Sequence, residues 1–401
     1  MSLTGKKNRS YLEARLFPFL KKVVVDIGQD RRILPGRQTQ SYSLLELIAI
    51  SGELPTNQIK RLPGGDRYKE EKIKSLRGNK LIHTYYRDKL RGYRLTAAAR
   101  EMLLADNPAR FQFYLTGNTE TNSPKYEITR RLRLHRIAET YITMRNAGAA
   151  IFRDAKPDVF SPEGGEAQSY TVESPAFYSS REIKGYGLEF VKIRGARTVG
   201  TLLTENTAYV VYNTGSSLMK WNYKSEIRTK ALMKTIILRR LQEQYQPESV
   251  QGLILGDNME TAYLLMTSTG GAKRDYFVLD GNYDNFHYIT NDHGGEVLLK
   301  LLCNPPKTAE LNRLLSGSLY ERDPGWIIEN DAIDENGEPV LFAYSFDMPR
   351  LVRFNSALQL QGKRGTVICF DYQADVLRRY CCGNTQFQTI DLQKFEGRFF
   401  P

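Results

Sequence analysis

The sequence predicts an α+β N-terminal part followed by a larger α/β region, and three observations indicate this. Short helical and β-prone segments follow one another closely between Ser41 and Asp106. A long helical pattern comes next, and from Ala150 onward β-prone runs alternate with helical ones, which is typical of a mixed α/β sheet. The chain has 401 residues, too many for one ordinary core, so we expect two or three domains.

We expect four segments along the chain. Residues 1–40 would form an N-terminal arm with a helix at about 10–22, and residues 41–106 a compact unit of helices and a hairpin. Residues 107–149 would hold a linker and an Arg-rich helix. Residues 150–401 would form the α/β region, and a division into two subdomains would fall near 305–330.

The compact unit begins with three short helical patterns. "SLLELIAISGELP" has apolar residues at helical spacing and ends at Gly52. Thr56 is placed to cap a second helix, "TNQIKRL", and Asp66 to cap a third, "RYKEEKIKSLRGNKL". We expect the third helix to turn its basic side chains outward and three others inward, namely Tyr68, Ile73 and Leu76.

A hairpin and a closing helix complete this unit. "LIHTYY" and "GYRLT" are β-prone runs on either side of the basic tip "RDKLRG", and Thr96 is placed to cap the helix "AAAREMLLA". Three helices, a two-stranded wing and a further helix predict a winged helix-turn-helix. In such a domain the third helix lies in the major groove of DNA and the wing contacts the flanking backbone.

The distribution of charge predicts a polyanionic partner. The net charge is +12 and the pI about 9.3, and residues 56–100 hold 13 Lys and Arg against 4 acidic residues. This clustering favours double-stranded DNA as the partner. The predicted DNA-binding side chains lie on the third helix, at the wing tip and on the Arg-rich helix: Arg67, Lys69, Lys72, Lys74, Arg77; Arg87, Lys89, Arg91; Arg130, Arg131, Arg133.

The segment "YEITRRLRLHRIAETYITMRNAGAAIF" predicts a long helix that ends at Gly148. Its arginines should lie largely opposite an apolar face, formed by Ile128, Leu132, Ile137, Tyr141 and Met144. Beyond it we expect strands at "ARTVGTLLT", "TAYVVYNTG", "VQGLILG", "DYFVLDG", "FHYIT", "PVLFAYSFD", "GTVICFD" and "FQTIDL", with helices between many of them.

Few catalytic signatures are present. There is no GxxxxGK[ST] loop and no dinucleotide-binding glycine pattern, and the four histidines and four cysteines lack metal-ligand spacing. We therefore expect no cofactor and no bound metal. One nuclease-like pattern is an alternative: Asp158 after Pro157, and Glu182 and Lys184 in "REIK", could act with Mg²⁺ as in PD-(D/E)xK nucleases, if the acids lie on adjacent strands.

The N-terminus has no continuous apolar core before a small-residue cleavage site, and the chain has no apolar run long enough to span a membrane. The sequence is therefore expected to be that of a cytoplasmic protein without membrane contact.

The basic winged helix ending in "GYRLTAAAREML", the helix "RRLRLHRIAETYITMRNAGA" and the α/β region together resemble the replication-relaxation proteins of plasmids and integrative elements. The resemblance implies a role in replication or mobilisation of the element and a second domain with a restriction-endonuclease-like fold. Where the family has acidic residues, this sequence has Asn213-Thr214-Gly215, which implies a fold kept for binding or assembly.

The leading interpretation is thus a non-catalytic, site-specific double-stranded DNA-binding protein of a bacterial mobile element. Its α/β region would join copies of the chain or recruit replication or transfer proteins. Two alternatives remain open: the metal-dependent nuclease, and a winged-helix transcription regulator whose α/β region senses a ligand.

Overall fold

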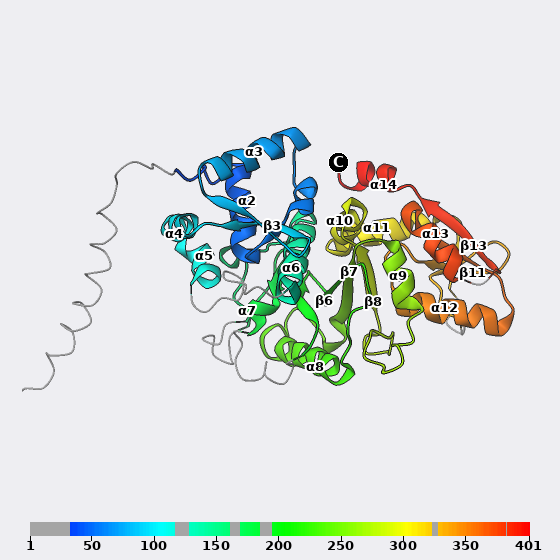
Figure 1. Ribbon diagram of the computed structural model, residues 1–401. Coiled ribbons are helices and arrows are strands. Elements are labelled where there is room, and N and C mark those ends of the chain that lie inside the picture. The colour runs from blue at the N-terminus through cyan, green and yellow to red at the C-terminus, as the bar shows by residue number, and fades with distance from the viewer. Residues whose placement is uncertain (1–32, 117–127, 161–168, 185–194, 323–327, 382) are drawn as a thin grey trace, which may run out of the picture.

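The computed structural model describes residues 33–116, 128–160, 169–184, 195–322, 328–381 and 383–401 (Figure 1). The helix expected at residues 10–22 lies outside the described residues. The fold is mixed α+β, as the sequence predicted at this coarse level, and the described residues form three sheets. None of the helices described is both long and apolar enough to cross a membrane.

The N-terminal unit contains the helices and the hairpin that the sequence predicted. α2 (Gln40–Ser51) is followed by η1 (Thr56–Arg61) and α3 (Asp66–Gly78). β2 (Ile82–Arg87) and β3 (Leu90–Leu95) form an antiparallel hairpin, which β1 (Leu54–Pro55) extends to the order β1-β3-β2. α4 (Ala97–Asp106) closes the unit, and its predicted cap is confirmed because the Thr96 side chain accepts from the Ala99 amide.

Several local predictions in this unit were wrong. η1 is a 3₁₀ helix whose cap position is Pro55, so Thr56 is its first residue and not its cap. Asp66 likewise begins α3, after Gly65. The inward stripe of α3 is Lys69, Ile73 and Leu76, at spacings of four and three residues, whereas the Tyr68 side chain is 43% exposed.

The predicted linker contains a helix that the sequence analysis missed. α5 (Pro108–Leu115) begins at the Asn107 cap with a proline in its first turn, and it buries Phe111 and Tyr114. The rest of that linker, residues 117–127, lies outside the described residues. The Arg-rich helix is present as α6 (Ile128–Asn146).

α6 does not have the apolar face that was expected in its first half. Ile128 and Leu132 are 46% and 39% exposed, while Arg131 and His135 are buried. In the second half Tyr141 and Met144 are buried as predicted. α6 packs against α2 on one side and β6 on the other, and it therefore joins the N-terminal unit to the α/β region (Figure 1).

The first five-stranded sheet has the order β4-β5-β6-β7-β8. β4 (Ala176–Ser179), β5 (Thr198–Leu203) and β6 (Ala208–Gly215) are antiparallel neighbours, and β7 (Val250–Gly256) and β8 (Phe286–Thr290) continue in parallel with β6. Three helices connect its strands, namely α7 (Ser180–Lys184), α8 (Tyr223–Arg240) and α9 (Met259–Met266). The strand expected at "DYFVLDG" is absent, and within it only Tyr276 forms a single bridge, to Lys220.

The second five-stranded sheet has the order β13-β12-β11-β10-β9. β9 (Tyr320–Glu321), β10 (Ala332–Ile333) and β11 (Pro339–Phe342) are antiparallel neighbours, and β12 (Gly365–Phe370) and β13 (Thr385–Ile390) run parallel to β11. The helices after β8 are α10 (His293–Leu302), which packs against β8 of the first sheet, α11 (Pro305–Leu315), α12 (Met348–Gln361), α13 (Asp371–Tyr380) and α14 (Leu392–Phe399). Of these, the sequence analysis did not foresee α11 and α14.

Candidate functional site

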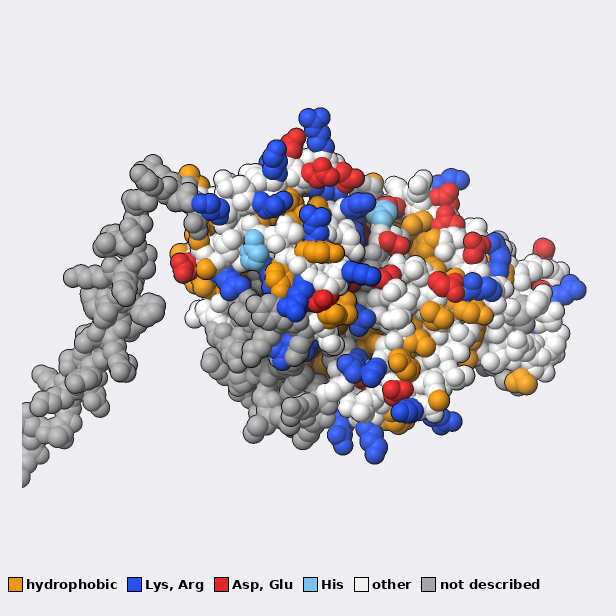
Figure 2. All heavy atoms as spheres, viewed as in Figure 1, with side chains coloured by type: hydrophobic (Ala, Val, Ile, Leu, Met, Phe, Trp, Pro, Cys, Tyr) orange, Lys and Arg blue, Asp and Glu red, His pale blue; other side chains and the backbone are white. Residues whose placement is uncertain are grey.

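Basic side chains gather over the part of the molecule that contains α3 and the β2–β3 hairpin. In the view of Figure 2, Lys and Arg are frequent over this part, with a group of acidic side chains among them at the top, and acidic and basic side chains also mix over the second sheet. All but one of the predicted DNA-binding residues of α3 and the hairpin lie at the surface: Arg67, Lys72, Lys74, Arg77, Arg87, Lys89 and Arg91. The structure thus brings most of the predicted cations onto two neighbouring elements.

The outer face of α3 carries four of these cations. The Arg67 side chain is 94% exposed, and its ion pair with Glu71, one turn further along, is 3.4 Å long. The Lys72 ammonium lies 4.6 Å from the centre of the Tyr68 ring. Exposed contacts of this kind contribute little stability, so these side chains can exchange them for a phosphate at small cost.

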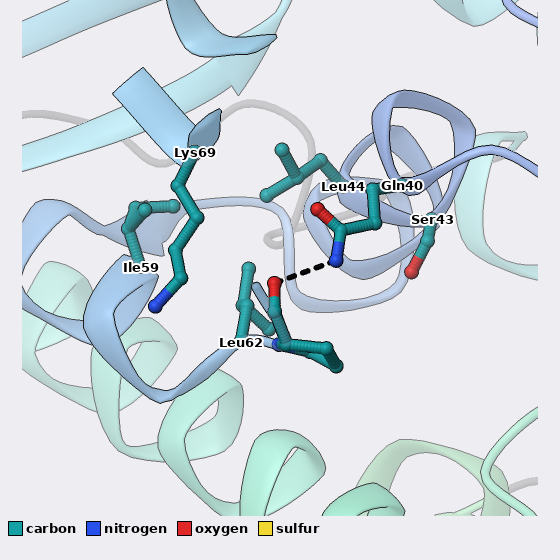
Figure 3. A pocket seen from close by; sticks show the side chains of 7 residues that line it. Gln40, Ser43, Leu44, Ile59, Leu62 and Lys69 are labelled. Carbon is teal, nitrogen blue, oxygen red and sulfur yellow. Dashed lines mark hydrogen bonds between the residues drawn. The ribbon is translucent and has the colours of Figure 1, made fainter. Parts of the chain in front are cut away.

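Lys69 is the exception, because its side chain is only 6% exposed. Its ammonium donates to the Lys60 carbonyl at the end of η1 (2.8 Å) and to Asp66 (3.3 Å). Figure 3 shows this side chain passing Ile59, opposite the hydrogen bond from Gln40 to the Pro63 carbonyl (2.6 Å). The pocket in that view has a volume of about 20 Å³, room for about one water molecule. The hydrogen bonds of the Lys69 ammonium to Lys60 and Asp66 fix the start of α3 against η1.

An open groove runs between η1, α3 and β3. Its volume is about 500 Å³, and its lining includes Lys60, Lys74, Arg77 and Tyr93. Asp66 and Glu70 also line it, but cations are in excess. A groove of this shape and charge fits an extended anionic chain better than a small enclosed ligand.

The tip of the hairpin is a two-residue turn. Arg87 pairs with Leu90, and Asp88 and Lys89 between them have φ of 52° and 63°. This left-handed pair has the backbone of a type I′ turn, which favours Asn and Gly and costs a side chain such as lysine some strain. Neighbouring contacts must therefore hold the tip in this shape.

Arg131 supplies those contacts. Its guanidinium donates to three backbone carbonyls of the hairpin, those of Arg87 (2.9 Å), Leu90 (3.1 Å) and Tyr85 (3.3 Å). Its side chain is 2% exposed. It is therefore not accessible for the DNA contact that the sequence predicted. Arg130 is half-buried and Arg133 exposed, and both lie near the start of α6.

Glu53 is the counterion of this arrangement. Its side chain is fully buried and pairs with Arg131 (2.5 Å) and Arg94 (2.7 Å), and it lies 2.8 Å from the His135 ring nitrogen. Burial raises the pKa of Glu53, but hydrogen bonds from His135, Arg131 and Arg94 outweigh it and lower the pKa to about 2. Gly92 makes room for the carboxylate, since a Cβ there would lie 2.4 Å from a Glu53 oxygen.

The network also includes Tyr85. The Arg94 and Arg131 guanidinium carbons lie 3.6 and 4.6 Å from the centre of its ring. We call Glu53, Arg94, Arg131, His135 and Tyr85 the Glu53 network. Because its members come from the turn before β1, from both hairpin strands and from α6, the network fixes the hairpin on α6.

The two predicted nuclease acids each pair with a basic side chain other than Lys184. Asp158 is exposed and pairs with Arg153 (2.7 Å). Glu182 lies on α7 and not on a strand, and its buried carboxylate is occupied by Lys156 (2.8 Å) and by the Ser179 amide and hydroxyl. Lys184 is the last residue of α7, and its side chain is outside the description. Over the part of the chain that is described, no three His, Cys, Asp or Glu side chains could together hold a metal ion.

Sequence reasoning missed a buried polar junction between the N-terminal unit and the first sheet. Arg61 of η1 pairs with Glu296 of α10 (2.5 Å) and donates to Thr143 of α6 (2.7 Å). Asn146 donates to the same Glu296 oxygen (2.9 Å) and to the Arg61 carbonyl (3.0 Å). The chain segment that leads into α3 is thus tied to the α/β region.

Two carboxyl groups with raised pKa lie at the same junction. Burial raises the pKa of Glu139 on α6 to about 7, assisted by the negative charge of Asp257. Burial also raises the pKa of Asp257, against the effect of Arg136. A signal in the sequence could have found this place. The parallel strand β6 ends in "NTG", and polar residues directly follow β7 in "GDN" and β8 in "TND", at the same edge of the sheet.

The arrangement as a whole offers an exposed cationic surface on a rigid support, and the predicted acids Asp158 and Glu182 are paired with Arg153 and Lys156. Comparisons with protein-family models, with curated proteins and with solved structures found no match for this chain.

Proposed function

We propose that the chain is a non-catalytic, site-specific double-stranded DNA-binding protein of a bacterial mobile element, acting in replication or mobilisation of that element. In this proposal α2, η1, α3 and the β2–β3 hairpin form a winged helix-turn-helix. α3 enters the major groove with Arg67, Lys72, Lys74 and Arg77, and the hairpin contacts the flanking phosphates.

The observation that carries the proposal is the pairing of an exposed cationic tip with a buried support. Arg87, Lys89 and Arg91 are exposed at the hairpin tip, while Arg131 and Glu53 fix the same hairpin from below. A protein that only needed solubility would have no reason to hold its surface cations on such a rigid element. Rigid placement matters for DNA, because groove contacts require a fixed orientation on the duplex.

The resemblance to replication-relaxation proteins supplies the biological setting of the proposal, and we extend it to a restriction-endonuclease-like α/β region kept for assembly. The occupied carboxylate of Glu182 supports a non-catalytic role, since an acid bound by Lys156 and Ser179 is not available to hold Mg²⁺. A winged-helix transcription regulator would share the same DNA-binding half.

The salt dependence of DNA affinity tests the proposal. Replacing Arg87, Lys89 and Arg91 by alanine should weaken binding to duplex DNA and reduce the slope of log K against log salt by about one unit per lost contact. The matched control replaces three exposed cations of α8, Lys224, Arg228 and Arg239, which removes the same charge far from the hairpin. Equal slopes for the hairpin variant and the wild type would contradict the proposed contacts.

A further inference from the structure

The second five-stranded sheet ends in β13, and no described strand pairs with the outer edge of β13. The other edge strands in the described residues, including β9 at the far edge of the same sheet, are short, charged or covered. β9 has two residues, β2 carries exposed His83 and Arg87, β4 is bridged by Ala150, and β8 is bridged to Asp347. β13 has six residues, with no charge, no proline and no glycine, and its pairing with β12 has no bulge. Natural edge strands usually carry one of these protections against pairing with another strand.

The backbone of β13 presents hydrogen-bonding groups away from its sheet. The Asn384 carbonyl accepts from the Gly365 amide of β12 (3.3 Å), so Asn384 and every second residue after it point toward β12. The N–H and C=O groups of Phe387 and Thr389 therefore point outward. The natural ligand of such a row is another extended strand.

The side chains of β13 indicate that its partner strand is a second copy of β13. The stretch Thr385-Gln386-Phe387-Gln388-Thr389 reads the same in both directions. When a strand pairs antiparallel with its own copy across a two-fold axis at Phe387, Phe387 faces its counterpart, Thr385 faces Thr389 and Gln386 faces Gln388. Aromatic pairs and threonine pairs directly opposite one another stabilise antiparallel strands, and the absence of charge avoids like-charge repulsion.

We propose that the chain forms a symmetric dimer through β13, joining the two C-terminal sheets into one continuous sheet. The two-fold axis would pass beside Phe387. Because its backbone groups point outward, Phe387 and the same residue of the second copy would form a hydrogen-bonded pair. The Phe387 ring is already anchored in the monomer, since it packs against the core beneath α13 and lies 5.8 Å from the Arg378 guanidinium carbon. Dimerisation would therefore need little rearrangement.

The position of β13 is compatible with the cationic surface of the N-terminal unit. Figure 1 shows α3 in the left half of the view and β13 near its right end. A dimer through β13 leaves both copies of α3 and of the β2–β3 hairpin open. The inference does not depend on what those surfaces bind.

Sedimentation of the full-length chain at micromolar concentration tests the dimer and its register. The wild type should sediment as a species of twice the 46.0 kDa chain mass. Gln386 and Gln388 are both exposed and face each other across the axis, so the Q386K/Q388K variant places like charges opposite at both positions. Its dimer dissociation constant should rise at least tenfold. The matched variant Q386K/Q388E places opposite charges there and should stay dimeric.

A monomeric wild type would overturn the inference. It would also fall if the Q386K/Q388K chain dimerised as tightly as the wild type, because another surface would then hold the copies together. Equal dissociation of both double variants would overturn the proposed register. Circular dichroism of each variant confirms that the monomer is folded.

Discussion

Replacing Glu53 by glutamine should destabilise the N-terminal unit strongly. Glu53 is fully buried, and the substitution leaves the Arg94 and Arg131 guanidinium groups buried without a counterion. The fall of the pKa of Glu53 from 4.5 to about 2 gives a measure of the loss. At about 1.4 kcal/mol per pH unit, it corresponds to about 3 kcal/mol, which agrees with the cost of breaking a buried ion pair.

The lowered pKa of Glu53 also determines how the stability of the protein depends on pH. Because the folded-state pKa of Glu53 is below its unfolded value, its contribution is present above about pH 4.5 and is lost as the pH falls toward 2. Urea denaturation followed by circular dichroism should show the E53Q variant less stable by about 3 kcal/mol at pH 7, with a flatter acid limb. The control is E101Q on the exposed face of α4. If E53Q unfolded within about 0.5 kcal/mol of the wild type, the Glu53 network would not hold the hairpin.

Three further substitutions, the first with a matched control, test other parts of the structure. Arg131→Met should lower stability by about 3 kcal/mol, because it leaves Glu53 buried without this partner. The control K74A, at an exposed cation of α3, should change stability by less than about 0.5 kcal/mol and alter only the salt dependence of the proposed DNA binding. Equal denaturation curves for the two would contradict the buried role of Arg131. G92A should be destabilised by several kcal/mol in the same assay, roughly the cost of overpacking, because the new Cβ meets Glu53, and a neutral effect would contradict this close approach. Glu139→Gln should raise stability on the order of 1–3 kcal/mol above pH 7, where the wild type must bury a charged carboxylate, and leave it similar below pH 4.5. An E139Q stability profile parallel to that of the wild type would show that Glu139 titrates normally.

The sequence predicted the order of elements well where local signals are strong. The Thr96 cap, the hairpin between "LIHTYY" and "GYRLT" and the apolar strands β6, β7 and β12 are present as expected. Periodicity and capping depend on neighbouring residues alone, so they can be recognised without tertiary information.

The orientation of charged side chains could not be predicted in the same way. Lys69 and Arg131 have the sequence context of surface cations, yet both are buried. The Lys69 ammonium donates to the Lys60 carbonyl and to Asp66, and Arg131 pairs with the distant Glu53. Tyr68 is correspondingly displaced to the surface. The partner of Arg131 lies 78 residues away in the chain, beyond the reach of any helical pattern.

The nuclease pattern failed for a related reason. Glu182 was expected on a strand, but the strand ends at Ser179, whose amide and hydroxyl bind the Glu182 carboxylate at the start of α7. Two acids and a lysine in a short pattern do not specify their partners, and here Lys156 takes the carboxylate.

Selection of bound DNA from a library of element-derived duplex fragments tests the central claim most directly. The full-length chain is incubated with the fragments in the presence of Mg²⁺, and the retained DNA is sequenced. We expect enrichment of one intact site, lost when Arg87, Lys89 and Arg91 are replaced by alanine. Enrichment of cut ends would contradict the non-catalytic role, and retention of no preferred sequence would contradict site-specific DNA binding.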